Sequence, residues 1–204
     1  GTGTITANSG ADVLALISAR GSIDVTASGA STGITADSTG TTAGDGNVTI
    51  TADSATGTVR GEANGAGAGM GDVTVNAAAA ATAQAVATGN TAVVNAAAAT
   101  NILGTGSDVT VTSARAGTAT SPTVIAINGT AVAGQTDSAN ITANGIVTLT
   151  NNANLEAITL SGNSVAVTYN IAASEAFTTA GAQNVTISGT ASDLADSKIS
   201  DSSS

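Results

Sequence analysis

A five-residue pattern of apolar and small polar residues recurs along the chain. Each copy reads apolar, small polar, apolar, small polar, small, as in Val48-Thr49-Ile50-Thr51-Ala52. Alternation with a period of two predicts a β-strand that buries one side, because successive side chains of a strand point to opposite faces. The central apolar residues of the copies, which we call the markers, are Ile5, Val25, Ile50, Val75, Val94, Val111, Ile127, Leu149, Val167 and Ile187.

The spacing of the markers predicts a stack of coils. Intervals run from 16 residues (Val111 to Ile127) to 25 residues (Val25 to Ile50), with a mean of about 20. One such strand is not stable alone, whereas parallel copies about 4.8 Å apart pair their backbones and bury one apolar column. We therefore predict an all-β parallel β-helix, or β-solenoid, of about ten coils of roughly 20 residues. Weaker second strands lie between the markers, at residues 13–17, 33–36, 58–60, 85–87, 102–103, 141–143 and 158–160.

Two alanine runs, at residues 77–81 and 96–99, favour a helix by intrinsic propensity. Each run follows a marker strand and an asparagine, Asn76 or Asn95, at the same position of the repeat. We therefore expect a corner of stacked small residues, with a short helix as the alternative.

Composition decides between this architecture and its rivals. An antiparallel sandwich also has short, regularly spaced strands, but its core is about 10 Å thick and needs large side chains. The chain has one Phe, one Tyr and no Trp. Disorder goes with low hydrophobicity, and 42% of these residues are hydrophobic. The coil length and the turn residues favour stacking within one chain over an intermolecular cross-β assembly.

The residues flanking each marker are predicted to form two outward columns. Hydrogen-bonded ladders are the simplest role for such columns; an ice-binding or glycan-binding face is the alternative. Strict Thr-x-Thr pairs occur at 4/6, 49/51, 110/112 and 148/150. The column after the markers is Thr6, Thr26, Thr51, Asn76, Asn95, Thr112, Asn128, Thr150, Thr168 and Ser188. The column before them is Thr4, Asp24, Thr49, Thr74, Val93, Thr110, Ala126, Thr148, Ala166 and Thr186, interrupted by Asp24, Val93, Ala126 and Ala166.

The charge balance excludes several classes of partner. With 4 basic and 14 acidic residues the net charge is −10, which argues against binding to nucleic acid or to anionic membrane surfaces. The apolar stretches are too short for a transmembrane helix. No signal-peptide pattern is visible, so we expect a processed form or a piece of a larger protein.

The side-chain inventory argues against catalysis. Without His or Cys the chain has no His-based triad, no thiol chemistry and few options for zinc. Tyr169 and Phe177 are the only aromatic residues, so a sugar-cleaving site would lack platforms. We predict no enzyme, no catalytic residue and no cofactor. The carboxylates include Asp12, Asp24, Asp37, Asp45, Asp53, Asp72, Asp108 and Asp137.

Metal ligands cannot be assigned from the sequence. Asp and Asn in turns suit calcium, but the nonapeptide of calcium-binding β-rolls is absent. We favour turn capping and solubility as the role of the carboxylates. The glycine-rich segment 61–71 lacks the Lys-Ser/Thr ending of a phosphate-binding loop and is predicted to be a turn. Glycosylation sequons at Asn47, Asn128, Asn140 and Asn184 arise by chance in strands rich in threonine.

Three strings, GSIDVTASG (21–29), GNVTITADS (46–54) and GDVTVNAAA (71–79), resemble the repeats of bacterial filamentous haemagglutinin-type adhesins. Residues 155–199 are similar to the Ala/Thr/Ser-rich solenoid repeats of large bacterial S-layer and giant surface proteins. The resemblance implies a right-handed parallel β-helix, export to the bacterial cell surface, and a role in adhesion or in a matrix or coat. It transfers no functional residue.

We therefore expect one solenoid domain over residues 1–204, with more regular haemagglutinin-like coils at 1–136, S-layer-like coils at 137–199 and a polar tail at 200–204. The expected function is that of an extracellular structural or adhesive protein. Its expected partners are further copies, in a filament or layer, and host or matrix glycans or proteins. We expect neither nucleic-acid binding nor membrane insertion.

Overall fold

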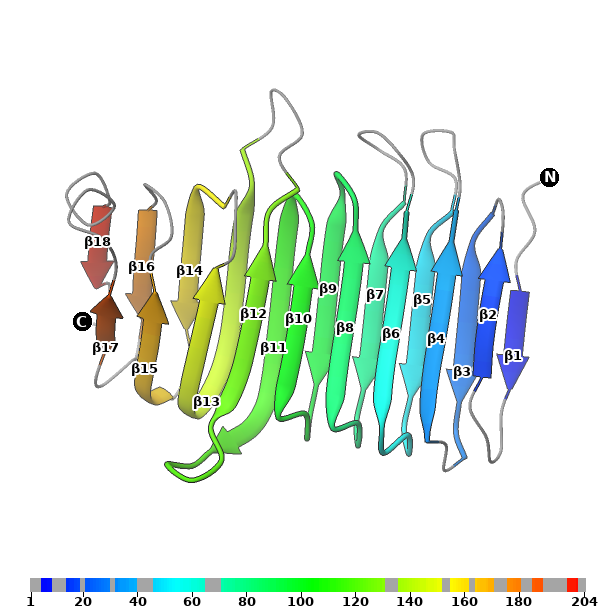
Figure 1. The fold of residues 1–204 in the computed structure, drawn as a ribbon, viewed down its shortest axis with the longest axis horizontal. Coiled ribbons are helices and arrows are strands. Elements are labelled where there is room, and N and C mark those ends of the chain that lie inside the picture. The colour runs from blue at the N-terminus through cyan, green and yellow to red at the C-terminus, as the bar shows by residue number, and fades with distance from the viewer. Residues whose placement is uncertain are drawn as a thin grey trace.

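The computed structural model describes the backbone of residues 5–8, 14–18, 21–29, 32–39, 46–64, 71–130, 136–151, 155–161, 164–170, 176–180, 185–188 and 198–201. Within these ranges all the regular secondary structure consists of β-strands. The strands form two stacks, wall A and wall B, and the chain alternates between them. Figure 1 shows the strands of wall A pointing down and those of wall B pointing up, from the blue N-terminal end to the red C-terminal end.

Wall A consists of parallel strands, each paired with the next one in the wall. Its members are β1 (Ile5–Asn8), β3 (Ile23–Ala27), β5 (Val48–Ala52), β7 (Val73–Ala77), β9 (Thr91–Ala96), β11 (Asp108–Gly117), the first part of β13 (Ser138–Asn151), β14 (Ala157–Ser161), β16 (Ala176–Ala180) and β18 (Lys198–Asp201).

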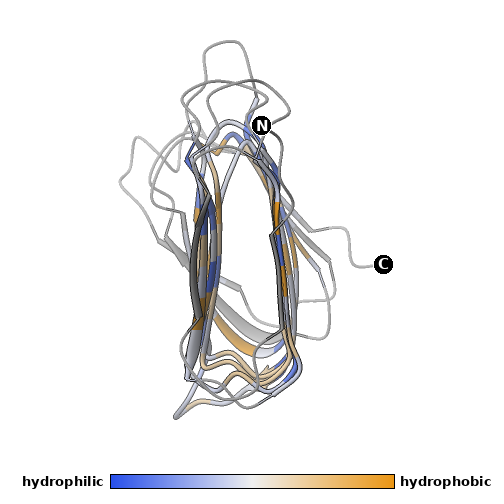
Figure 2. Ribbon diagram, turned by 90° about the vertical axis from the view of Figure 1, so that its right-hand side faces the viewer, coloured by the Kyte–Doolittle hydropathy of each residue, from blue (hydrophilic) through white to orange (hydrophobic). Residues whose placement is uncertain are grey.

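Wall B is built in the same way. Its members are β2 (Leu14–Ser18), β4 (Gly33–Ser38), β6 (Thr58–Ala63), β8 (Thr82–Ala87), β10 (Asn101–Thr105), β12 (Thr123–Asn128), the second part of β13, β15 (Ser164–Asn170) and β17 (Val185–Ser188). Seen along the stack, the walls face each other across a narrow interior (Figure 2). The prediction of an all-β, parallel, solenoid-like fold is confirmed.

The core between the walls is thin and filled by small and β-branched side chains. The central inward column of wall A is at most 1% exposed and comprises Val25, Ile50, Val75, Val94, Val111, Ile141 and Leu160. A neighbouring inward column of wall A contains Val73 and Val109. These valines face glycines of wall B: a Cβ on Gly104 would lie 2.4 Å from Val109 Cγ1, and one on Gly61 would lie 2.8 Å from Val73 Cγ1. A core of this thickness needs no aromatic residues, which explains why the chain folds almost without them.

The prediction that the markers form one column is wrong. Markers Val25 to Val111 do share a column of wall A, but Ile5 registers with Ile23, two residues away from Val25. The last four markers, Ile127, Leu149, Val167 and Ile187, belong to wall B.

The physical reason is that both walls alternate with the same period of two, so a strand's pattern does not reveal its wall. Along wall A the partner of Val111 is Ile141, not Ile127. Accordingly, the segments 141–143 and 158–160, predicted as second strands, contribute strands to wall A, whereas the earlier second-strand segments lie in wall B.

The markers move from wall A to wall B where β11 and β13 run through the corner between the walls (Figure 1). The corner brings Gly117 and Gly145 into register. Gly145 has φ +70°, which favours glycine, and a Cβ on Gly117 would lie 2.0 Å from the Ile146 carbonyl oxygen. These two glycines therefore permit a continuous strand to turn from one wall to the other.

The alanine runs form the predicted corner, and the helical alternative is wrong. Residues 78–81 and 97–100 leave wall A as bends that stack on the preceding coil. The Ala78 amide donates to the Ala52 carbonyl at 3.0 Å, and the Ala97 amide donates to the Ala77 carbonyl at 3.1 Å. Ala80 and Ala99 are fully buried. A small side chain suits these two positions because both lie in the closely packed interior. The prediction of a turn over the glycine-rich segment 61–71 is wrong for residues 61–63, which complete β6, and residues 65–70 lie outside the described residues.

Candidate binding surface

The outer face of wall A carries two files of mostly uncharged polar side chains, which follow the register of the strands. All of them are exposed or half-buried. File 1 is Asp24, Thr49, Thr74, Val93, Thr110, Asn140 and Thr159. File 2 is Thr26, Thr51, Asn76, Asn95, Thr112, Thr142 and Ser161.

The predicted columns are confirmed from Asp24 and Thr26 as far as Thr112, and wrong beyond it. Members predicted after Thr112 lie on wall B, including the pair Thr148 and Thr150. At the other end Thr6 registers with Asp24 rather than Thr26, and Thr4 lies outside the described residues.

The true files are more regular than the predicted columns. The residues missed by the sequence interpretation are Asn140, Thr142, Thr159 and Ser161. The predicted interruptions Ala126 and Ala166 disappear from wall A because they belong to wall B. Asp24 and Val93 remain as interruptions.

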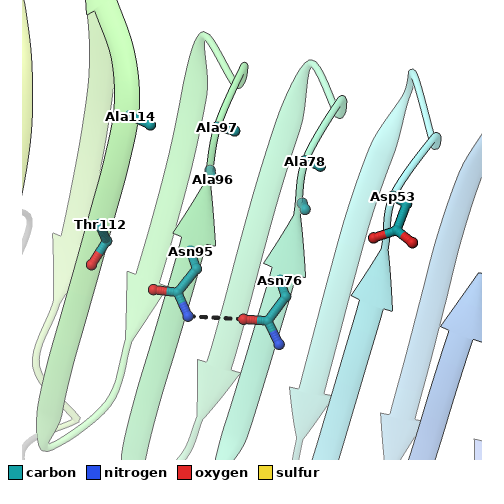
Figure 3. A pocket seen from close by; sticks show the side chains of 9 residues that line it. Asp53, Asn76, Ala78, Asn95, Ala96, Ala97, Thr112 and Ala114 are labelled. Atoms are coloured by element: carbon teal, nitrogen blue, oxygen red, sulfur yellow. Dashed lines mark hydrogen bonds between the residues drawn. The ribbon is translucent and has the colours of Figure 1, made fainter.

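Hydrogen bonds link neighbouring members of file 2. The Asn95 Nδ2 group donates to Asn76 Oδ1 at 2.8 Å (Figure 3). The Thr142 and Ser161 hydroxyl oxygens lie 3.2 Å apart. The ladder interpretation is thus confirmed at Asn76 and Asn95, and Thr142 and Ser161 extend it to residues outside the predicted columns. Wall B has a bond of the same kind, in which Asn128 Nδ2 donates to Thr105 Oγ1 at 3.1 Å.

A shallow groove of about 270 Å³ runs beside file 2, where wall A meets the alanine corner. Figure 3 shows its two sides, with the file 2 side chains in one row and the small corner side chains in another. The groove exists because the corner residues are short and lie beside longer amides. Its lining includes Asn76, Asn95, Thr112, Ala78, Ala97, Ala114 and, at one end, Asp53.

Apart from Asp24, the files contain no charged side chain. Between Thr49 and Ser161 neither file contains an ionisable residue. Wall B instead carries an ionic cluster, in which Arg60 forms an ion pair with Glu62, and Asn64 Nδ2 donates to Asp37 Oδ1 at 3.4 Å. Partial burial, reinforced by the Glu62 carboxylate, raises the pKa of Asp37 above its ordinary value, while Arg60 and the Asn64 hydrogen bond oppose the shift.

Several of the predicted carboxylates cap the edge where wall B returns to wall A. Asp72 Oδ1 accepts from the Thr91 amide at 3.2 Å, and the Asp72 amide donates to Asn47 Oδ1 at 2.9 Å. Asp137 is buried, and its Oδ2 accepts from the Thr130 amide at 2.6 Å. These bonds confirm the turn-capping interpretation for Asp72 and Asp137.

The prediction of no cofactor, with calcium as its alternative, is not decided by the side chains. Over the part of the chain whose side chains are described, no three acidic residues converge in a way that would hold a metal ion. Asp12 and Asp45 lie outside the described residues. Of the sequons, Asn140 is exposed in file 1, the Asn47 and Asn128 side chains are hydrogen-bonded, and Asn184 lies outside the described residues.

Comparison with known proteins adds no family to this picture. No protein-family model matches the chain, and no curated protein or solved structure matches it. Among the described residues no helix has the length and apolar character needed to cross a membrane.

Proposed function

We propose that this chain is a solenoid segment of an extracellular bacterial surface protein, an adhesin, surface layer or self-assembling filament, with a structural and adhesive role. The observation that carries the proposal is file 2, in which the same kind of side chain recurs on successive strands from Thr26 to Ser161. A repeated surface suits a repeated or extended partner. An enzyme needs a unique constellation of reactive groups, and the residue types of this chain do not favour one.

The finer architecture belongs to the same proposal. Register partners are separated by 25 residues between Ile23 and Val48 and by 19 residues between Ala139 and Ile158, which supports about ten coils of roughly 20 residues. Right-handed winding is supported by the strong preference of parallel strand crossovers for that hand.

Self-association is supported by the strands at the two ends of the stack. β1 and β2 pair with β3 and β4, and β17 and β18 pair with β15 and β16. Among the described strands none lies on their other sides. Such edges accept further strands, either from more coils of the same protein or from another copy.

Analytical ultracentrifugation over a wide concentration range, combined with electron microscopy, tests this proposal. We expect oligomers or filaments whose size grows with protein concentration. A chain that stays monomeric at high concentration, with and without calcium, would contradict self-assembly.

A second candidate function is recognition of a ligand, ice or a glycan, by wall A. It is favoured by the absence of ionisable groups from the files between Thr49 and Ser161. Thr49/Thr51 and Thr110/Thr112 lie together on this wall, whereas Thr148/Thr150 lies on the opposite one. Thermal-hysteresis and glycan-array measurements separate the two ligands.

A further inference from the structure

We propose that the groove beside file 2 binds a neutral, linear polysaccharide lying along the axis of the stack. This inference rests on the adhesive part of the proposed function and assigns to it a site and a class of ligand.

The groove offers a series of equivalent subsites. Each is a file 2 residue and the exposed residue two positions further on, and both line the groove. The pairs are Asn76/Ala78, Asn95/Ala97 and Thr112/Ala114, and Asp53 stands at the end of the series. Strand stacking repeats the pairs at about 4.8 Å. A ligand that contacts several of them must itself repeat along its length, as a polymer does.

Each subsite has a polar side, formed by file 2, and an apolar side, formed by alanine methyl groups. The Asn95–Asn76 hydrogen bond uses one donor and one acceptor, so the Asn76 Nδ2 group and the Asn95 Oδ1 atom remain for a ligand. A sugar hydroxyl can satisfy either one, because it both donates and accepts. The exposed methyl groups of Ala78, Ala97 and Ala114 form the other side. Pyranose rings carry hydroxyls at their edges and C–H groups on their faces, and therefore match both sides.

Charge restricts the class of sugar. No cation lines the groove, and Asp53 stands at one end of it. The chain as a whole has a net charge of −10. Phosphorylated, sulfated and uronic-acid polymers would be repelled. Between Asn76 and Thr112 the groove has no carboxylate to pair with a cationic amino sugar, so neutral polymers fit it best.

The absence of aromatic platforms from the groove determines how affinity arises. Each alanine methyl offers less contact area than an aromatic ring, so one sugar unit binds weakly. Several subsites occupied by one chain multiply the effect. We therefore expect affinity to rise steeply with oligosaccharide length.

Ice is the less suitable occupant. A flat crystal face contacts a flat surface, whereas the alanine row forms a recess beside file 2. Val93 also interrupts file 1 near the middle of the wall.

A matched pair of variants tests the groove. Ala97 and Ala98 are adjacent exposed residues of the same corner, but only Ala97 lines the groove. Ala97→Gln and Ala98→Gln are titrated calorimetrically with soluble neutral oligosaccharides (cello-, chito- and manno-oligomers of two to eight units), with dextran sulfate as the anionic probe. We expect binding of at least one neutral series, stronger for longer oligomers, and none of dextran sulfate. Ala97→Gln should raise Kd about tenfold, and Ala98→Gln less than about twofold.

Three outcomes would overturn the inference: wild-type protein that binds none of the neutral oligomers, equal loss in both variants, or thermal hysteresis that Ala97→Gln abolishes, which would assign the surface to ice. Ultracentrifugation of the same samples keeps the two proposals apart. Self-assembly without oligosaccharide binding contradicts only the groove, and binding by a strictly monomeric protein contradicts only the assembly.

Discussion

The side chain of Asn95 donates a hydrogen bond to the side chain of Asn76 on the neighbouring strand of wall A, over 2.8 Å between nitrogen and oxygen. The two residues also pair in the backbone register of β7 and β9. Each is followed by an alanine run that turns the corner. The amide bond therefore links two coils at the position where the chain leaves the wall, and it borders the candidate groove.

Removing this bond should destabilise the stack modestly. We expect Asn95→Ala to lower the free energy of unfolding by about 1 kcal/mol, since the bond is neutral and partly exposed. Urea denaturation followed by circular dichroism measures the change. Thr26→Ala in the same file is the control, because no hydrogen bond of its side chain is found among the described residues, and it should cost less than about 0.5 kcal/mol. Equal losses in the two variants would show that the amide bond adds nothing.

The inward column is open to a sharper test. Val75 is fully buried on wall A, and a carboxylate there would have no partner. Val75→Asp should lower the free energy of unfolding by about 4 kcal/mol or more. Thr74→Asp, one residue earlier and pointing outward, should cost less than about 1 kcal/mol. Thermal melts of both variants give the comparison. A melting temperature unchanged by Val75→Asp would show that the inward face of β7 is misassigned.

The strands and their inward faces were predictable from sequence because period-two alternation is a local property. Val75 and Ile50 could be placed inside from their immediate neighbours alone. Beyond Val111 it was not predictable whether a strand belongs to wall A or to wall B, because this depends on the number of residues in each corner. The interval from Val111 to Ile127 resembles a short coil, yet the register partner of Val111 is Ile141.

The candidate binding surface was likewise predictable only in part. The files were predictable as far as Thr112, and their continuation at Thr142 and Ser161 was missed. A signal was present, since Asn140-Ile141-Thr142 and Thr159-Leu160-Ser161 repeat the polar–apolar–polar pattern. The groove itself was not predictable, because it depends on the stacking of Ala78, Ala97 and Ala114 across three coils.

Wall B provides a pH-dependent prediction. The raised pKa of Asp37 means that folding favours its protonated form, so this residue's contribution to stability is greatest below its ordinary pKa of 3.8 and is lost as pH rises through the folded-state pKa. Asp37→Asn should therefore stabilise the protein at neutral pH, by a small amount because the group is partly solvated. The advantage should shrink as pH falls toward 3.8 and below.

Urea denaturation of wild type and Asp37→Asn at several pH values measures this difference. Glu62→Gln is the matched background, since it removes the smaller of the two causes that raise the Asp37 pKa and leaves the larger one, burial. There the advantage of Asp37→Asn at neutral pH should be smaller. An advantage that grows as pH falls would contradict the assigned direction.

The thin core predicts that one methyl group is too large at Gly104. A Cβ there would lie 2.4 Å from Val109 Cγ1 on the opposite wall, closer than carbon atoms can approach. Gly104→Ala should lower the free energy of unfolding by about 1–3 kcal/mol through overpacking.

A double-variant cycle tests the contact. Val109→Ala removes the clashing methyl but leaves a cavity, which should cost about 1–3 kcal/mol by itself. In the double variant the new methyl occupies part of that cavity, so the combined loss should be smaller than the sum of the two by about 1 kcal/mol or more. Urea denaturation of all four proteins completes the cycle, and strictly additive losses would show that the walls do not touch at this point.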